Sequence, residues 1–337
     1  MKKRALITGI TGMVGSHMLD YLYMNTNWDI WGLLRWRSPT ENIKNYFKAI
    51  NNKKRVFLVY ADIRDPISTR HAIKTARPNF VFHLAAQSFP QTSFNSPLDT
   101  YQTNIQGTTN VLDALKEYSK NAMIHVCSSS EVFGRVSKNE IPIKEETKFH
   151  PASPYAISKI GTDLIGRFYA EAYGMNVMTT RMFTHTGPRR GDVFAEASFA
   201  KQIALAENNF IEKEISVGNL NSLRTIADVR DAVRAYYLLL TVKPKPGEYY
   251  NIGGKHTVKI SRLLNDLIGL SKLKKQLKIV VDKERLRPID ADLQVPDTSK
   301  FSRHTGWKPL ISYTQTLIDL LEYWRTMVRL NGNLLKR

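Results

Sequence analysis

The chain has 337 residues, a length that suits two domains or one large α/β unit, and a formal net charge of +19. Hydrophobic residues make up 42% and charged residues 23%, which excludes a disordered chain. A single cysteine, Cys127, excludes an internal disulfide scaffold and favours a reducing cytoplasm as the location.

The positive charge lies in short, scattered clusters such as 53–55 and 272–275. Such clusters are typical of a solvated surface, so no nucleic-acid partner is expected. There is also no run of about 18 apolar residues, the length needed for a membrane-spanning helix, so no membrane association is predicted.

Short apolar runs alternate with helix-length segments in the first half of the chain. They predict strands at residues 5–8, 29–34, 56–60, 80–84 and 124–127. A long helix is expected at about 97–118, a second at about 155–173, and a sixth strand at 176–180. Strands that alternate with helices form right-handed βαβ units, so the predicted fold class is α/β, a doubly wound parallel sheet of the Rossmann type.

The alternation becomes irregular beyond the sixth strand. We therefore assign residues 1–181 and 229–254 to a dinucleotide-binding domain. Residues 182–228 and 255–337 are expected to form a smaller α+β lobe that binds the substrate.

Three glycines, Gly9, Gly12 and Gly15, recur at every third position directly after the first strand. In dinucleotide-binding folds such glycines make a tight turn, admit the pyrophosphate and let the helix pack against the strand. The pyrophosphate then lies at a helix N-terminus, where free N–H groups favour an anion. The predicted contacts from this turn are Gly9, Thr11, Gly12, Met13, Val14 and Gly15.

The end of the second strand predicts which dinucleotide is bound. NAD usually requires an acidic residue there, whereas an arginine accommodates the 2′-phosphate of NADP. This chain has Arg35, Arg37 and Ser38 and no acid. A guanidinium matches a phosphate in shape and charge, so NADP is expected rather than NAD.

Tyr155 and Lys159 are four residues apart and therefore share one helix face. A tyrosine near pKa 10 is a poor base, and a nearby ammonium together with a positive nicotinamide ring would lower that pKa. Ser129 and Glu131 follow the fifth strand. Because a doubly wound sheet binds ligands at the carboxyl ends of its strands, both motifs are expected to meet there.

With these motifs the chain resembles the extended short-chain dehydrogenase/reductase superfamily over essentially its full length. Within it, the sequence is most similar to GDP-mannose 4,6-dehydratase and the related GDP-heptose 4,6-dehydratases. The segments that carry the resemblance are 8–15, 83–88, 129–131, 153–159, 187–191, 218–224 and 286–288.

The resemblance implies roles for the residues of these segments. Ser129 would hydrogen-bond the substrate hydroxyl, Tyr155 would be the base and Lys159 its activator. Glu131 would be a second base near carbon 5 of the sugar, and Asn104 a structural asparagine. Further cofactor contacts would come from Asp62, Ile63, Leu84, Ala85, Ala86, Gln87, Tyr155, Lys159 and His185. Substrate contacts would come from Ser88, Thr184, Arg190, Lys201, Asn219, Arg224, Arg287 and Asp290, with the diphosphate on Arg224 and Arg287 and with no metal.

Three positions depart from the family pattern. Ser129 stands where threonine is more common, which keeps the hydroxyl. Ser130 stands at a catalytic position where the dTDP-glucose type has an aspartic acid, so the proton for the departing hydroxyl must come from elsewhere. Thr184 replaces a usual asparagine, which puts one sugar or phosphate contact in doubt.

The resulting function is a nucleotide-sugar 4,6-dehydratase that acts on GDP-mannose or GDP-manno-heptose with internal hydride transfer through NADP. One alternative is an NADPH-dependent reductase of GDP-4-keto-6-deoxy sugars, a group that shares the triad and can also carry Ser-Ser-Glu, so Glu131 does not separate it from a dehydratase. Another is a 4-epimerase, which has no need of Glu131. A catalytically inactive protein is disfavoured because Ser129, Tyr155 and Lys159 are all present.

Two helices carry more apolar residues than one sheet face requires. In relatives such helices form a dimer seam, so a homodimer or a homotetramer is expected. The residues concerned are Ile105, Val111, Leu112, Leu115, Ile157, Ile160, Leu164 and Phe168.

Overall fold

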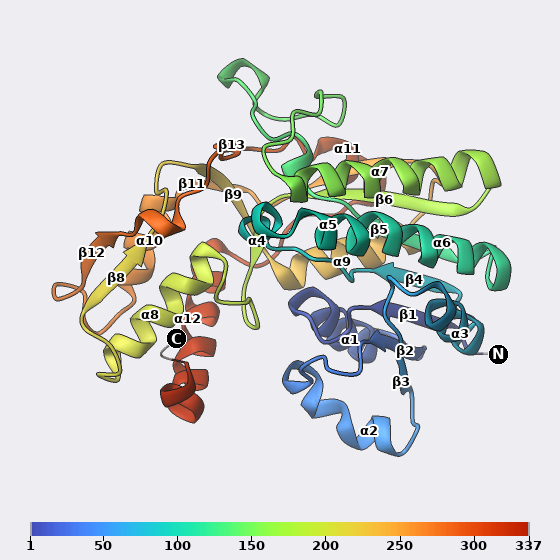
Figure 1. Ribbon diagram of the computed structural model, residues 1–337, viewed down its shortest axis with the longest axis horizontal. Coiled ribbons are helices and arrows are strands. Elements are labelled where there is room, and N and C mark those ends of the chain that lie inside the picture. Colours follow the sequence, from blue (N-terminus) through green and yellow to red (C-terminus); the bar gives the residue numbers. More distant parts are fainter. Residues whose placement is uncertain (1, 336–337) are drawn as a thin grey trace.

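A seven-stranded sheet forms the centre of the computed structural model, which describes residues 2–335 (Figure 1). The strand order is β10-β6-β5-β4-β1-β2-β3, and all neighbours are parallel. The strands are β1 (Arg4–Thr8), β2 (Asp29–Leu34), β3 (Val56–Tyr60), β4 (Phe80–His83), β5 (Met123–Cys127), β6 (Asn176–Met182) and β10 (Tyr249–Ile252). The predicted doubly wound sheet is confirmed.

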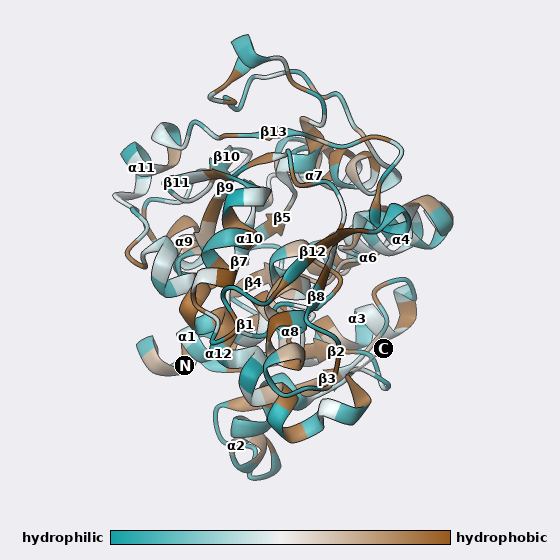
Figure 2. Cartoon of the chain, turned by 90° about the vertical axis from the view of Figure 1, so that its left-hand side faces the viewer, coloured by the Kyte–Doolittle hydropathy of each residue, from teal (hydrophilic) through white to brown (hydrophobic). Residues whose placement is uncertain are grey.

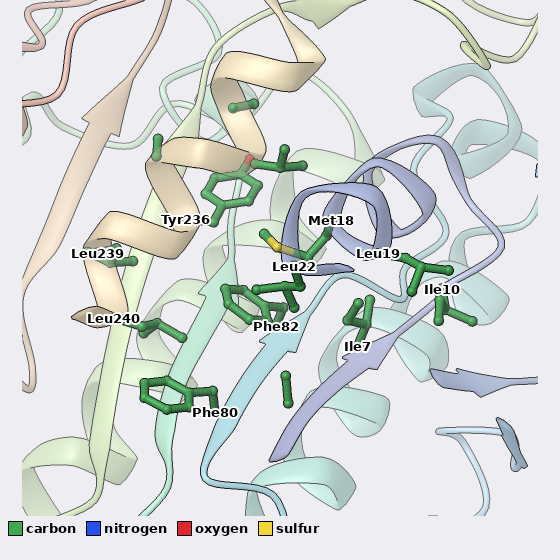
Figure 3. Close-up of a cluster of buried hydrophobic side chains, with 14 of the residues drawn as sticks. Ile7, Ile10, Met18, Leu19, Leu22, Phe80, Phe82, Tyr236, Leu239 and Leu240 are labelled. Atoms are coloured by element: carbon green, nitrogen blue, oxygen red, sulfur yellow. The ribbon is translucent and has the colours of Figure 1, made fainter. Parts of the chain in front are cut away.

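Helices cover both faces of this sheet because residues alternate between the faces along each strand. On β1, Ile7 packs into a core with α1 (Met13–Asn25) and α9 (Val229–Thr241), as Figure 3 shows. Its neighbour Leu6 packs into the opposite core with α3 (Pro66–Ala76), α6 (Gly107–Tyr118) and α7 (Pro154–Tyr173).

The start and end of α7 are set by local sequence signals. The Ser153 side chain caps the helix by accepting a hydrogen bond from the Ala156 N–H, and Pro154 occupies the first turn. Gly174, with φ +62°, ends the helix in the left-handed conformation that glycine adopts without strain. These signals place Tyr155 in the first turn, at the carboxyl edge of the sheet.

Most of the remaining elements form the smaller lobe, which faces the viewer in Figure 2. Its core lies between α8 (Ala195–Glu207), α10 (Ile260–Gly269) and α12 (Tyr313–Asn331). Its strands are β7 (His185–Thr186), β8 (Glu214–Val217), β9 (Leu223–Asp228), β11 (His256–Lys259), β12 (Lys278–Val281) and β13 (Leu293–Gln294). Short helices elsewhere are α2 (Phe47–Asn51), α4 (Pro90–Asn95) and α5 (Pro97–Tyr101). No helix within residues 2–335 is long and apolar enough to cross a membrane.

The chain crosses between the sheet and the lobe repeatedly. It leaves the sheet after β6, returns at α9 and leaves again after β10. It then returns at α11 (Ser299–Thr305) before it ends in α12 of the lobe. Phe301 and Trp307, which our boundary at 254/255 placed in the lobe, pack instead in the core of the sheet beside Tyr250.

The two apolar helix stripes have different surroundings. Val111, Leu112 and Leu115 on α6 are fully buried in the sheet's own core, so the expectation that they form part of a dimer seam is wrong. On α7, by contrast, Leu164 and Phe168 are about half exposed, at 47% and 53%. The exposed part of the α7 stripe is therefore available to a partner, together with Ile105, which is half-buried.

A buried ion pair fastens α7 to β6. Arg181 donates from Nε and Nη2 to the two carboxylate oxygens of Asp163 at 2.8 and 3.0 Å, and from Nη1 to the Glu145 carbonyl at 2.6 Å. Both charged side chains are almost completely buried. Such a bidentate pair compensates the desolvation of each charge only while its partner is present.

We expect Asp163→Ala to lower the free energy of unfolding by about 3–5 kcal/mol, because it leaves the Arg181 charge buried without compensation. Urea unfolding followed by circular dichroism measures the change. Arg70→Gln is the matched control, since it breaks the solvent-exposed pair with Glu117 and should cost about 1 kcal/mol or less. Equal losses in the two variants would contradict the argument.

Candidate active site

A cleft of about 1000 Å³ lies between the carboxyl edge of the sheet and the lobe. The loops after β1, β2, β3, β4, β5 and β6 line one side, and residues of α8, β8 and β9 line the other. Every predicted site residue lines this cleft except Arg37 and Lys201. The topology thus brings together side chains that are far apart in the sequence.

The glycine turn after β1 leaves room for an anion. Gly9 has φ +69°, and a Cβ on it would lie 2.9 Å from the Ala85 Cα. A Cβ on Gly15 would lie 2.2 Å from the Gly9 carbonyl oxygen, so only glycine permits this packing. Gly12 caps α1 without a side-chain hydrogen bond, which leaves N–H groups of the first turn open. These features fit the pyrophosphate of a dinucleotide.

The end of β2 contributes Arg35 and Ser38 to the cleft. Arg37 lines a small adjoining pocket with Trp36 and Tyr60, and Arg35 lines both. Arg37 is therefore displaced from the main cleft, because it lies two residues beyond Arg35 in the turn that follows the strand. Both arginines lie in the turn after β2, and Arg35 joins the small pocket to the main cleft.

Asn104 fastens the loop after β4 to α7. Its Oδ1 accepts from the Gln87 N–H at 2.8 Å, while its Nδ2 donates to the Gln87 carbonyl and to Ser158 Oγ. Asn104 lies in a π-helical segment, Gln102–Gln106, between α5 and α6, and such segments are frequent at functional sites. The structural role that the resemblance implied is supported by these bonds.

Tyr155, Ser129 and Lys159 meet at the floor of the cleft. Burial raises the pKa of the Tyr155 phenol, while a hydrogen bond with Ser129 and the charge of Arg190 act in the opposite direction. Burial lowers the pKa of Lys159, whose Nζ donates to the Cys127 carbonyl at 2.8 Å and lies 6.0 Å from the Tyr155 ring centre. The lowered tyrosine pKa expected from the sequence is therefore absent from the protein alone, because burial outweighs the hydrogen bond and the nearby charge.

Glu131 follows β5, as the sequence indicated, and lies in a 3₁₀ turn, Ser130–Val132. The turn forms because Ser129 Oγ accepts the Glu131 N–H, which caps it. The Glu131 carboxylate reaches toward the lobe, where Arg224 Nη1 lies 3.4 Å from its Oε1. A carboxylate thus lies on the same turn as the serine that bonds Tyr155.

The lobe side of the cleft is rich in arginine. Arg287 Nη1 lies 3.6 Å from Asp290, which also accepts from Asn219 Nδ2 at 2.9 Å. The Arg190 guanidinium lies 3.4 Å from the centre of the Phe194 ring and pairs with Glu196. These cations suit an anionic ligand.

The other predicted contact residues differ in whether they line the cleft. Ser88, Ser130, Thr184 and His185 line the cleft, and burial beside Arg190 lowers the pKa of His185 to about 4, which keeps its ring neutral. Lys201 on α8 points to Asp192 instead, with a hydrogen bond of 2.7 Å, and does not line the cleft.

Sequence reasoning missed some residues of the cleft. Arg285 lines it two positions before Arg287 and donates to Ser198 Oγ at 3.3 Å, and its place in an Arg-x-Arg pair was a usable signal. Asn42 lines the cofactor end and donates to the Thr11 carbonyl at 2.9 Å, but no motif marks it. Within residues 2–335 no cluster of His, Cys, Asp or Glu is suited to hold a metal ion.

The sequence model of the GDP-mannose 4,6 dehydratase family matches residues 6–320. The chain belongs to this family. GDP-6-deoxy-D-mannose reductase of Pseudomonas aeruginosa is 31% identical over 98% of this chain and 99% of its own length. GDP-mannose 4,6 dehydratase 2 of Arabidopsis thaliana is 31% identical over 93% of this chain and 84% of its own. The structure of RMD from Pseudomonas aeruginosa complexed with NADPH superposes with a TM-score of 0.81 at 30% identity, over 97% of this chain and all of that one.

Proposed function

We propose that this member of the family is a 4,6-dehydratase that converts GDP-mannose or GDP-manno-heptose to its 4-keto-6-deoxy product with NADP. The observation that carries the proposal is the Glu131 carboxylate, which lines the cleft on the turn that begins at Ser129. A dehydratase needs a second base beside the tyrosine, and Glu131 supplies it. The open lobe arginines Arg224 and Arg287 suit the substrate diphosphate.

NADP is the cofactor that these residues fit, through the glycine turn and Arg35. When bound it accepts and returns a hydride, and its positive ring opposes the rise in the pKa of Tyr155. Lys159 lies beside that tyrosine and adds a second positive charge. The remaining steps belong to side chains of the cleft.

The proton steps follow from the arrangement of Tyr155, Ser129 and Glu131. Tyr155 takes the proton of the hydroxyl on carbon 4, which Ser129 orients by a hydrogen bond. The ketone that results acidifies the hydrogen on carbon 5, so a carboxylate such as Glu131 is a sufficient base. Once protonated, Glu131 can return that proton to the departing hydroxyl of carbon 6, a role for which the neighbouring Ser130 hydroxyl is a far weaker acid.

The second candidate is the NADPH-dependent reductase. The observation that favours it is sequence similarity, because the GDP-6-deoxy-D-mannose reductase of Pseudomonas aeruginosa is as similar to this chain, at 31% identity, as the Arabidopsis dehydratase is. The two activities use the cofactor differently, since a dehydratase returns it unchanged and a reductase consumes it.

One assay separates the two candidates. The enzyme is incubated with GDP-mannose and a trace of NADP⁺ without reductant, and the mass of the product is measured by mass spectrometry. Loss of one water per sugar supports the dehydratase. If the enzyme instead oxidises NADPH one-for-one with a GDP-4-keto-6-deoxy sugar and leaves GDP-mannose intact, the reductase is the correct function.

We expect Glu131→Gln to lower the turnover of water loss by roughly 10²–10⁴-fold, the contribution of a general base. The first oxidation should persist, and it is measured as a transient absorbance of the reduced nicotinamide. Tyr155→Phe, the matched variant, should abolish both steps. Turnover near the wild-type level in Glu131→Gln would contradict the role of Glu131.

We propose that Arg35, with Arg37 beside it, selects NADP over NAD. Arg35→Asp should weaken NADP binding about tenfold or more, since a charge-assisted pair with phosphate contributes roughly 1.5–3 kcal/mol. Its affinity for NAD should not fall. Fluorescence titration of both dinucleotides measures the change, and equal affinity of the wild type for both would refute the assignment.

We propose that the exposed α7 stripe of Ile157, Leu164 and Phe168 joins two copies of the chain. These side chains are about half exposed, and a two-fold axis would bury the same stripe from both copies. A homotetramer would need a second interface elsewhere.

Phe168→Glu should therefore convert the dimer to a monomer, because it places a charge in the centre of the seam. Analytical ultracentrifugation at micromolar concentration measures the mass. Leu330→Glu is the control, since Leu330 is 66% exposed on α12 and outside the stripe. A monomeric wild type would overturn the proposal.

A further inference from the structure

The ion pair between Glu131 and Arg224 is weak by its geometry. Its 3.4 Å separation is longer than the roughly 2.7–2.9 Å of a strong charge-assisted hydrogen bond. Throughout residues 2–335, neither the carboxylate of Glu131 nor the guanidinium of Arg224 has another hydrogen-bond partner. Both groups line the cleft and are 12–15% exposed. Most of the hydrogen-bonding capacity of the Glu131 carboxylate and the Arg224 guanidinium is therefore unused.

The pair also joins the two sides of the cleft. Glu131 belongs to the turn after β5 at the edge of the sheet, whereas Arg224 belongs to β9 of the lobe. Around Arg224 the lobe offers Arg285, Arg287 and Asn219 to the same space. An anion held by these groups competes with Glu131 for Arg224.

A phosphate is the stronger competitor for this arginine. It accepts two parallel N–H bonds from a guanidinium, whereas Glu131 accepts one long bond. Arg287 is held in a similar way, since its Nη1 lies 3.6 Å from Asp290. Exchanging Asp290 for a phosphate therefore breaks only a long, weak contact.

We propose that the substrate diphosphate draws Arg224 away from Glu131, so that the carboxylate is released as a base only when the substrate occupies the lobe. A guanidinium stabilises the negative charge of a carboxylate and so opposes the uptake of a proton. The diphosphate then raises the rate of proton removal as well as the affinity. This inference rests on the proposed function, which takes Glu131 as the base at carbon 5.

The test presents the substrate in two pieces. The NADP-loaded enzyme receives a 4-keto-6-deoxyhexose without nucleotide in deuterated water, and exchange of the hydrogen on carbon 5 is followed by mass spectrometry. Inorganic pyrophosphate is then added as the diphosphate piece. We expect it to raise the exchange rate about tenfold or more, the factor for one charge-assisted hydrogen bond.

Two matched variants locate the effect. In Arg224→Gln no arginine pairs with the Glu131 carboxylate. The exchange rate without pyrophosphate should therefore already equal the stimulated wild-type rate, and pyrophosphate should not raise it further. Arg262 is an exposed arginine of α10 that pairs with Asp266 and does not line the cleft, so Arg262→Gln should keep both the low unstimulated rate and the wild-type response to pyrophosphate. Melting temperatures confirm that both variants are folded.

The proposal is overturned if pyrophosphate leaves the exchange rate of the wild-type enzyme unchanged. This measurement does not depend on any variant. The proposal is also overturned if Arg224→Gln exchanges no faster than the unstimulated wild type, which would make Arg224 a positioning residue for the base. Glu131→Gln separates this failure from failure of the proposed function. If that variant exchanges as fast as the stimulated wild type, Glu131 is not the base and the proposed function is wrong.

Discussion

The parallel direction of four adjacent strands is the constraint on which the site depends. β6, β5, β4 and β1 are neighbours and run the same way, so the loops that follow them leave from one edge. This edge brings the glycine turn after Thr8, the loop after His83 and the turn after Cys127 into one cleft. An antiparallel strand at any of these places would carry its loop to the opposite end of the sheet.

In the protein alone, the charged forms of several ionisable groups in the cleft are only weakly stabilised. Burial favours a neutral phenol at Tyr155 and disfavours the charge of Lys159, while the arginines of the lobe are held by long contacts to acids. In the proposed mechanism a charged ligand brings each of these groups to its working state. A dinucleotide and a diphosphate supply charges of the required kinds, and the net charge of +19 favours the approach of both.

Periodicity predicted the sheet well because buried parallel strands are short and continuously apolar. The strands at 29–34 and 56–60 have the bounds that the sequence gave reason to expect. The motifs around Gly9, Ser129 and Tyr155 were placed correctly at one edge, since topology alone brings them together. All three carry a chemistry that is visible in the residue types themselves.

What periodicity could not predict depends on tertiary contacts. The apolar face of α6 has the same pattern whether a sheet or a partner covers it, so its burial was visible only in the fold. Lys201 matched a family position, but Asp192 holds its side chain elsewhere. The contact between Glu131 and Arg224 joins residues 93 positions apart on different lobes, and no local pattern encodes it.

The repeated crossings of the chain between sheet and lobe have a mechanical consequence. Two bodies that share one linker can swing freely, whereas here five connections, near Met182, Asp228, Ile252, Thr298 and Ser312, join the sheet to the lobe. Opening of the cleft therefore requires a coordinated bend at all of them. The lobe also cannot be excised as a fragment, because its core is assembled from segments that are continuous only through the sheet.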